Sequence, residues 1–146
     1  FTEREAAIVQ GNLIHTIMSH IETGEDVADA LALFSRRGDI SLENFEEIQH
    51  TINKITTHPE LVPYYKEGLL IKNEKDIITK NGKLLRPDRL VFNGDEVAVI
   101  DYKTGKKDPA YHQQIYEYAD ALEEMGYLVA QKIIVYSNEN VTPEFI

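Results

Sequence analysis

The chain has 146 residues, 42% of them hydrophobic and 27% charged, which fits one soluble domain with a single core. It contains no cysteine, so disulfides, a thiol nucleophile and a cysteine-ligated zinc or iron–sulfur site are excluded. Fifteen basic and 25 acidic residues give a formal net charge of −10, whereas free DNA-binding domains usually carry a positive balance. The composition therefore predicts weak DNA binding by the chain alone.

The surroundings of the chain can also be predicted. No apolar run reaches the length of a membrane span, and the first five residues do not have the features of a signal peptide. The absence of cysteine suits a reducing compartment, so we expect a cytoplasmic protein with no membrane partner. Because the chain opens inside a helical pattern, we expect a fragment of a longer polypeptide. Residues 1–146 would form one domain, with a helical part (1–66) and a sheet-and-helix part (67–146).

The helical part has the spacing of three helices. Apolar residues at helical intervals predict a first helix from about Arg4 to Ile21, ended by Thr23-Gly24. A second helix begins at Glu25 and stops at Gly38. Ser41 is a good N-cap for a third helix that runs to about His58-Pro59.

The second part changes to the spacing of strands. Strands are predicted at residues 69–79 (with a polar interruption at 72–76), 84–92, 96–103 and 127–137. Asp108 as N-cap and Pro109 at the first helical position predict a helix that ends at Gly126. The order is three helices, an antiparallel three-stranded meander, a crossover helix and a further strand. It predicts an α/β fold, with a mixed sheet of about four strands flanked by helices.

Asn93-Gly94 predicts a β-hairpin with a two-residue type I′ turn. In the register that this turn sets, Asp88 faces Val99. Side chains alternate in direction along a strand, so Asp101 and Lys103 lie on the same sheet face as Asp88. Diagonal neighbours on one face are about 7–8 Å apart, close enough for two carboxylates to hold one ion.

A hard cation gives this arrangement a chemical reason. Mg²⁺ prefers oxygen ligands and is typically held by one or two carboxylates and a substrate phosphate. Lys103 points into the same pocket, where it could orient or deprotonate the attacking water or pair with the phosphate. The backbone carbonyl of Tyr102 lies between the two key side chains and is a candidate further ligand. An isolated Asp-x-Lys is usually a solvated charge pair, but Pro87 and the apolar strand before Asp101 favour a built site.

These residues resemble a known family. Pro87-Asp88 followed by Asp101-Tyr-Lys-Thr-Gly105 is similar to the PD-(D/E)xK nuclease signature, in the form typical of RecB-like nucleases. Gly11-Asn-Leu-Ile-His15 and Gln114-Ile-Tyr-Glu-Tyr118 have the form of two further motifs of that branch. The motifs occur in the family's order, and the resemblance runs from about Gly11 to Tyr136.

The resemblance implies a restriction-endonuclease-like core, DNA as substrate, and Mg²⁺ as cofactor with Mn²⁺ as a substitute. It implies that His15 is a metal ligand, although a lone histidine on an apolar helix stripe is more often a packed core residue. Gln114 would orient the site or contact DNA, and Tyr118 would support it. The alternative for both is an ordinary amphipathic helix.

Glu74 matches a glutamate that the family often has on the strand before Pro-Asp. Its direction depends on the Asn81-Gly82 turn. A two-residue turn makes Glu74 face Arg89, away from the metal, whereas a three-residue turn makes it face Asp88. Participation in the site and a purely structural role both remain open.

Four basic residues are candidate DNA contacts, with a solvated surface as the alternative: Arg86, Arg89, Lys106 and Lys107. The other histidines have no metal-ligand spacing and are expected to be structural or exposed: His20, His50, His58 and His112. The sequence contains no glycine-rich phosphate loop, so an ATP-driven motor would have to lie elsewhere.

The function expected from the motifs is Mg²⁺-dependent hydrolysis of DNA, by the exonuclease module of a helicase–nuclease that processes DNA ends in recombination and repair. The helicase, in the same chain or complex, is implied by the resemblance alone. Relatives with an iron–sulfur cluster are disfavoured because the chain has no cysteine. Two alternatives stay open: a catalytically silent nuclease fold that binds DNA or acts as a scaffold, and a stand-alone endonuclease of the restriction or junction-resolving type.

Overall fold

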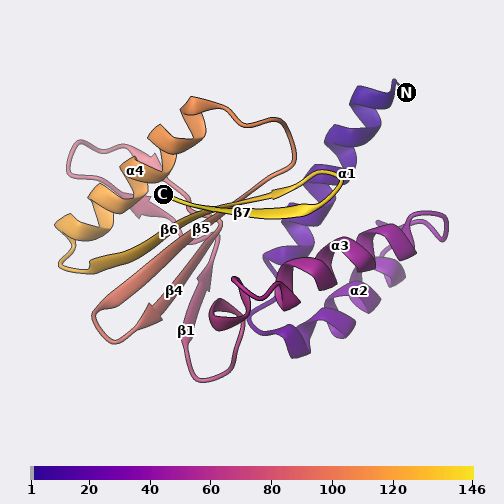
Figure 1. Cartoon of the computed structure of the whole chain (residues 1–146), viewed down its shortest axis with the longest axis horizontal. Coiled ribbons are helices and arrows are strands. Elements are labelled where there is room, and N and C mark those ends of the chain that lie inside the picture. The colour runs from indigo at the N-terminus through magenta and orange to yellow at the C-terminus, as the bar shows by residue number, and fades with distance from the viewer. Residues whose placement is uncertain (1) are drawn as a thin grey trace.

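The computed structural model describes residues 2–146. Its helices are α1 (Glu3–Met18), α2 (Val27–Arg36), α3 (Phe45–Thr57) and α4 (Pro109–Glu124), with 3₁₀ turns at Gly24–Asp26 and Val62–Tyr64. Its strands are β1 (Leu70–Asn73), β2 (Ile77–Ile78), β3 (Leu84–Leu85), β4 (Arg89–Asn93), β5 (Glu96–Lys103), β6 (Leu128–Ser137) and β7 (Val141–Phe145). Five strands form one sheet in the order β1-β4-β5-β6-β7, and β2 pairs with β3 in a separate hairpin (Figure 1).

The sheet is mixed and is covered on both faces. Strands β5 and β6 are parallel and joined through α4, whereas the other pairs are antiparallel. Helices α1, α2 and α3 pack on one face, against side chains such as Val91 and Ile100. Helix α4 packs on the other face, against side chains such as Leu90 and Val99 (Figure 1). The predicted α/β fold is confirmed. No helix among the described residues 2–146 is both long and apolar enough to cross a membrane.

Helix α1 ends earlier than the apolar pattern predicts. It begins with a capping box between Thr2 and Glu5, and its last residue is Met18. The carbonyl groups of Ser19 and Ile21, which a longer helix would leave free, accept hydrogen bonds from the Asn73 side chain at 3.2 and 2.9 Å. Partners from a distant strand therefore set the end of this helix.

The two long strands predicted before Asn93 are each broken in the structure. The first is divided into β1 and β2 around Glu74, whose φ of 51° lies in the left-handed region. The second is divided into β3 and β4 around Pro87, which has no N–H to donate to a ladder. The edge strand β7 was not predicted. It contains Pro143, which is tolerated there because one side of an edge strand needs no ladder hydrogen bonds.

The register predicted for the β4–β5 hairpin is wrong by two residues. Asn93 pairs with Glu96, so the turn residues are Gly94 and Asp95. Gly94 has a φ of 62°, which matches a type II′ turn with glycine at its first central position. A shift of two keeps every side chain on its predicted face. It brings Asp88 opposite Asp101 in place of Val99.

The turn after β2 has the three-residue form. The Thr79 N–H donates to the Lys83 carbonyl at 2.9 Å, which leaves Lys80, Asn81 and Gly82 between them. In the matching register of β1 with β4, the Glu74 N–H donates to the Asp88 carbonyl at 3.0 Å. Of the two positions considered for Glu74, the structure has the one beside Asp88.

Candidate active site

Asp88 and Asp101 lie side by side where β5 extends past the start of β4. The Asp88 N–H donates to Oδ1 of Asp101 at 3.0 Å, and the Tyr102 N–H donates to Oδ2 of Asp88 at 2.8 Å. The side chain of Asp88 is 11% exposed and that of Asp101 is 3% exposed. The apolar strand β5 thus holds a carboxylate in a place that water barely reaches.

Burial and the neighbouring charge make this pair electrostatically unfavourable when both groups are ionised. Burial, and next the charge of Asp88, raise the pKa of Asp101 to about 7. The Asp88 N–H bond and the charges of Lys103 and His15 act in the opposite direction and are weaker. The pair therefore favours either a proton or a cation near neutral pH.

His15 reaches the carboxylates from α1. Its Nε2 lies 2.5 Å from Oδ1 of Asp88, and its Nδ1 lies 3.3 Å from Oε1 of Glu74. The contact with Asp88 is the largest of the effects that raise the pKa of His15. Helix α1 comes this close because of Gly11, where an added Cβ would lie 2.5 Å from Oγ1 of Thr104.

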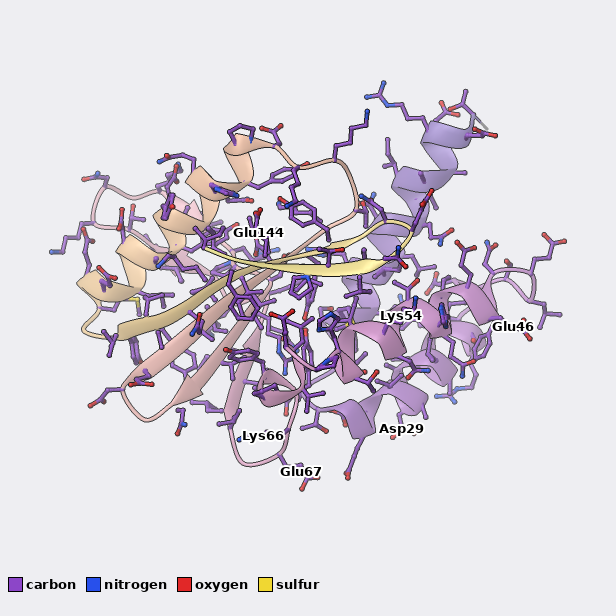
Figure 2. The ribbon with its side chains drawn as sticks, in the orientation of Figure 1. Asp29, Glu46, Lys54, Lys66, Glu67 and Glu144 are labelled. Atoms are coloured by element: carbon purple, nitrogen blue, oxygen red, sulfur yellow. The ribbon has the colours of Figure 1, made fainter. Side chains whose placement is uncertain are left out.

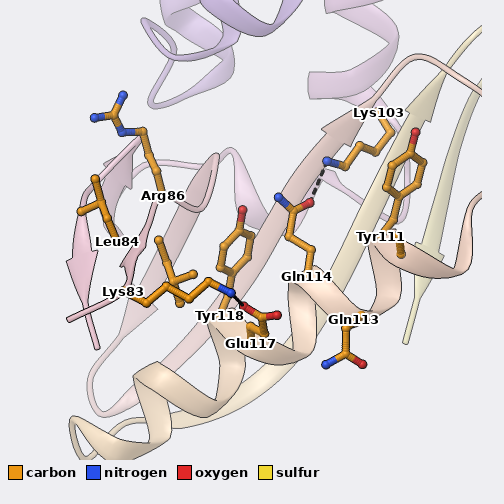
Figure 3. Close-up of a pocket in the computed structure, with 11 residues that line it drawn as sticks. Lys83, Leu84, Arg86, Lys103, Tyr111, Gln113, Gln114, Glu117 and Tyr118 are labelled. Carbon is orange, nitrogen blue, oxygen red and sulfur yellow. Dashed lines mark hydrogen bonds and ion pairs between the residues drawn. The ribbon is translucent and has the colours of Figure 1, made fainter. Parts of the chain in front are cut away.

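Lys103 joins the carboxylates to α4. Its Nζ lies 3.8 Å from Oδ2 of Asp101 and donates to Oε1 of Gln114 at 2.8 Å (Figure 3). The same Nζ sits 4.7 Å from the centre of the Tyr111 ring. Tyr118, one helical turn beyond Gln114, is 4% exposed, and burial raises the pKa of its hydroxyl far above neutrality. It is therefore a hydrogen-bond donor rather than a base at physiological pH.

The donor set fits a divalent cation in chemistry, although its members are bonded to one another. In the described part of the chain, no three or more His, Asp or Glu side chains are arranged as a preformed metal site. The facing atoms of His15 and Asp88 are in direct contact. Two buried carboxylates, the nearby Glu74 and a neutral imidazole are suitable ligands once that contact opens.

The backbone of Tyr102 also faces this site. Its hydroxyl lies 2.5 Å from the Tyr65 hydroxyl on the opposite side of the sheet, so the side chain points away from the carboxylates as predicted. Its N–H points toward Asp88, and in a strand the N–H and C=O of one residue point to the same edge. The Tyr102 carbonyl is therefore directed to the side on which Asp88 lies.

Arg89 was predicted to contact DNA or to lie on a solvated surface, and the structure shows that both predictions are wrong. It is fully buried, and its guanidinium donates to the carbonyls of Ile21, Glu22 and Tyr64 and lies 4.1 Å from the Tyr65 ring centre. Because Asp88 faces α4, strand alternation turns the next residue toward the helical part. A charged residue at such a position was the signal that could have revealed this role.

The other basic candidates are exposed. Arg86 pairs with Asp76 at 2.6 Å and Lys107 pairs with Glu144 at 3.1 Å, and Lys106 is exposed. Among the other histidines, His20 and His50 are exposed. His112 contacts Glu144 at 2.7 Å, and His58 accepts from the Glu60 N–H at 3.1 Å. These positions agree with structural or surface roles.

The charge is unevenly distributed along the chain. Residues 72–107, which carry the two aspartates and Lys103, contain nine Lys or Arg and six Asp or Glu, a net charge of +3. Residues 22–60 contain nine acidic and three basic residues, a net charge of −6. Asp29 and Glu46 point outward from α2 and α3 in this acidic part (Figure 2). The segment that carries the two aspartates and Lys103 is thus more basic than the chain as a whole.

Comparison with known proteins identifies a family. Residues 2–142 match the family model of the PD-(D/E)XK nuclease superfamily. A comparison with curated proteins finds no match. The matched span includes Asp88, Asp101, Lys103 and both accessory motifs, so the predicted superfamily is confirmed. The RecB-like branch remains a prediction.

Proposed function

The chain belongs to the PD-(D/E)XK nuclease superfamily, and from this premise we propose that it hydrolyses DNA phosphodiester bonds in a Mg²⁺-dependent reaction. We further propose that it is the exonuclease module of a RecB-like helicase–nuclease that processes DNA ends in recombination and repair. The observation that carries the first proposal is the buried Asp88–Asp101 pair with Lys103 beside it. The helicase association rests on the form of the motifs.

The residues would divide the work as follows. Asp88, Asp101, His15 and the Tyr102 carbonyl would hold the ion, with Glu74 at the rim through its position beside His15. The bound cation would lower the pKa of a water and offset charge on the scissile phosphate. Mn²⁺ would substitute for Mg²⁺, because both accept oxygen ligands.

Lys103 would act on the attacking water or the phosphate. The Gln114 side chain and the Tyr111 ring hold its ammonium group, so it is fixed before substrate arrives. Tyr118 would donate a hydrogen bond from the same helix, α4. Each of these groups comes from β5 or α4, which are rigid parts of the fold.

The proposal is tested with purified protein and linear and circular DNA, with Mg²⁺ or with EDTA. We expect cleavage of linear DNA that requires Mg²⁺ and is lost in Asp101→Asn. The control Asp95→Asn removes an exposed carboxylate from the β4–β5 turn and should keep full activity. Retained cleavage in Asp101→Asn would refute the site. Cleavage of circular DNA would refute the exonuclease assignment and indicate an endonuclease. A folded wild type that binds Mn²⁺ but cleaves no DNA would indicate a silent nuclease fold.

A further inference from the structure

A groove lies between the β2–β3 hairpin and α4 and leads to Lys103 (Figure 3). Its cavity volume is about 800 Å³. One wall is the segment from Lys83 to Arg86, and the other is the face of α4 that carries Gln114, Glu117 and Tyr118. Lys103 lies at one end of the groove, so an extended ligand bound in the groove would lead directly to the carboxylates of Asp88 and Asp101.

An ion pair crosses this groove. Nζ of Lys83 and Oε2 of Glu117 are 2.6 Å apart, and the two side chains are 60% and 36% exposed. A second cavity of about 400 Å³ continues beyond the pair and shares Lys83, Leu85 and Glu117 with the first. Exposed ion pairs contribute little to folding stability. The pair therefore contributes little to folding stability, but it places the ammonium group of Lys83 over the groove.

The width of the groove favours one strand over two. The Lys83 and Glu117 side chains meet across it, so their backbones are at most about 14 Å apart even with both side chains extended. The major groove of a duplex alone is about 12 Å wide, and a whole duplex is wider still. A duplex cannot enter between these walls, whereas an unpaired strand can.

We propose that this groove binds an unpaired DNA strand next to the scissile phosphate, and that a backbone phosphate replaces Glu117 as the partner of Lys83. The inference rests on the proposed nuclease function. Phosphate and carboxylate oxygens accept the same charge-assisted hydrogen bonds from an ammonium group. Leu84, which is 57% exposed, adds apolar surface to the hairpin wall against which a base can lie.

The far side of the ion pair limits the path. The second cavity is lined on α4 by Glu117, Asp120 and Glu124, and on the hairpin by Lys80 and Lys83. Three carboxylates on one helix wall repel a phosphate backbone. The phosphates of the DNA strand would therefore contact the groove as far as Lys83, where the strand would leave it.

The test is equilibrium binding in EDTA of a labelled 12-nucleotide oligodeoxythymidylate and of a duplex of equal length, followed by fluorescence anisotropy. Wild type should bind the single strand more tightly than the duplex. K83M should weaken single-strand binding about 3–10-fold and reduce the slope of log affinity against log salt by about 0.7. E117Q should strengthen binding about 2–5-fold, and its effect should vanish in the K83M background.

The pair Arg37–Asp39 supplies matched controls, because it is an exposed ion pair at the end of α2, away from the groove. R37M and D39N make the same charge changes and should alter binding less than twofold. Equal effects from the two pairs, tighter binding of the duplex, or no single-strand binding by wild type at low salt would overturn the inference. Mg²⁺-dependent cleavage is measured in parallel. If the protein cleaves DNA but K83M and E117Q leave its affinity for the single strand unchanged, only the proposed role of the groove is refuted. A complete lack of cleavage refutes the proposed function.

Discussion

Asp88 and Asp101 hold each other in place through the backbone. The N–H of Asp88 donates to the Asp101 carboxylate, and the Asp88 carboxylate accepts the N–H of Tyr102, the residue after Asp101. One oxygen of each carboxylate is thus used to fix the two strands, whereas the other faces His15 in Asp88 and Lys103 in Asp101. The cost is two buried acidic groups in contact, and this cost leads to measurable consequences in the metal-free protein.

Asp101→Asn should stabilise the metal-free protein at alkaline pH while removing its activity. The pKa of the Asp101 carboxyl is raised to about 7 in the folded state, so folded protein binds a proton that unfolded protein releases between pH 4 and 7. The wild-type free energy of unfolding therefore falls as pH rises through that window. We expect the variant to be more stable by about 1–3 kcal/mol at pH 8 and about equal to wild type near pH 4.

Urea unfolding in EDTA at both pH values measures this difference. Asp95→Asn is the control, because the same change of charge is made at an exposed turn residue. If Asp101→Asn destabilised the protein equally at both pH values, the carboxylate would be ionised without penalty and the account of the pair would fail.

Metal affinity should rise with pH. A cation requires the ionised form of Asp101 and the neutral form of His15, and the pKa values of both groups are raised in the metal-free site. Mn²⁺ binding should therefore release protons, and the dissociation constant should fall about 10-fold or more between pH 6 and 8. Calorimetry in two buffers of different ionisation enthalpy counts the protons released. A pH-independent dissociation constant would exclude these two groups as ligands.

The shared face of Asp88, Asp101 and Lys103 could be predicted although the register was wrong. Side-chain direction in a strand depends on odd or even position, and the error in the β4–β5 turn was two residues. The face was therefore right while the residue opposite Asp88 was not. The position of Glu74 depended on the length of a different turn, where the sequence allowed two answers and only the structure chose between them.

Other features depend on contacts between distant segments and have no local signal. Arg89 contacts carbonyl groups that are 25–68 positions away along the chain. Lys83 and Glu117 are 34 positions apart and meet only because the hairpin folds beside α4. Local patterns predict periodicity, caps and turns, whereas these pairings follow from how the elements pack.

Gly11→Ala should lower activity much more than stability. The new Cβ would lie 2.5 Å from Oγ1, 3.1 Å from Cγ2 and 3.2 Å from Cβ of Thr104. Rotation of the threonine can move Oγ1 away, but it leaves the contact with the threonine Cβ unchanged. Helix α1 must shift and carry His15 with it, although alanine favours the helix by about 0.8–1 kcal/mol. We expect a change in stability below about 1 kcal/mol and a loss of metal affinity of about 10-fold or more.

Thr104→Ala supplies the test of this contact, because it removes Oγ1 and Cγ2. Added to Gly11→Ala, it should restore most of the metal affinity, while alone it should change little. Calorimetric titration with Mn²⁺ compares the four proteins. A double variant as weak as Gly11→Ala would show that the spacing between α1 and Thr104 does not control the position of His15.

Arg89→Met should be among the most destabilising single changes at a polar residue in this chain. The methionine fills similar volume, but it leaves the carbonyls of Glu22 and Tyr64 without their donor. The Ile21 carbonyl keeps only its hydrogen bond from Asn73. Each buried acceptor left unpaired costs about 1–3 kcal/mol, so we expect a loss of about 3–5 kcal/mol in the free energy of unfolding, measured with urea.

Arg89→Lys should recover part of this stability, because an ammonium group can reach some of these oxygens, although fewer than the planar guanidinium. Arg37→Met, which removes an exposed arginine, should cost less than about 0.5 kcal/mol. A loss in Arg89→Met no larger than in Arg37→Met would mean that water replaces the guanidinium. The end of α1 would then be held to the sheet by Asn73 and apolar packing alone.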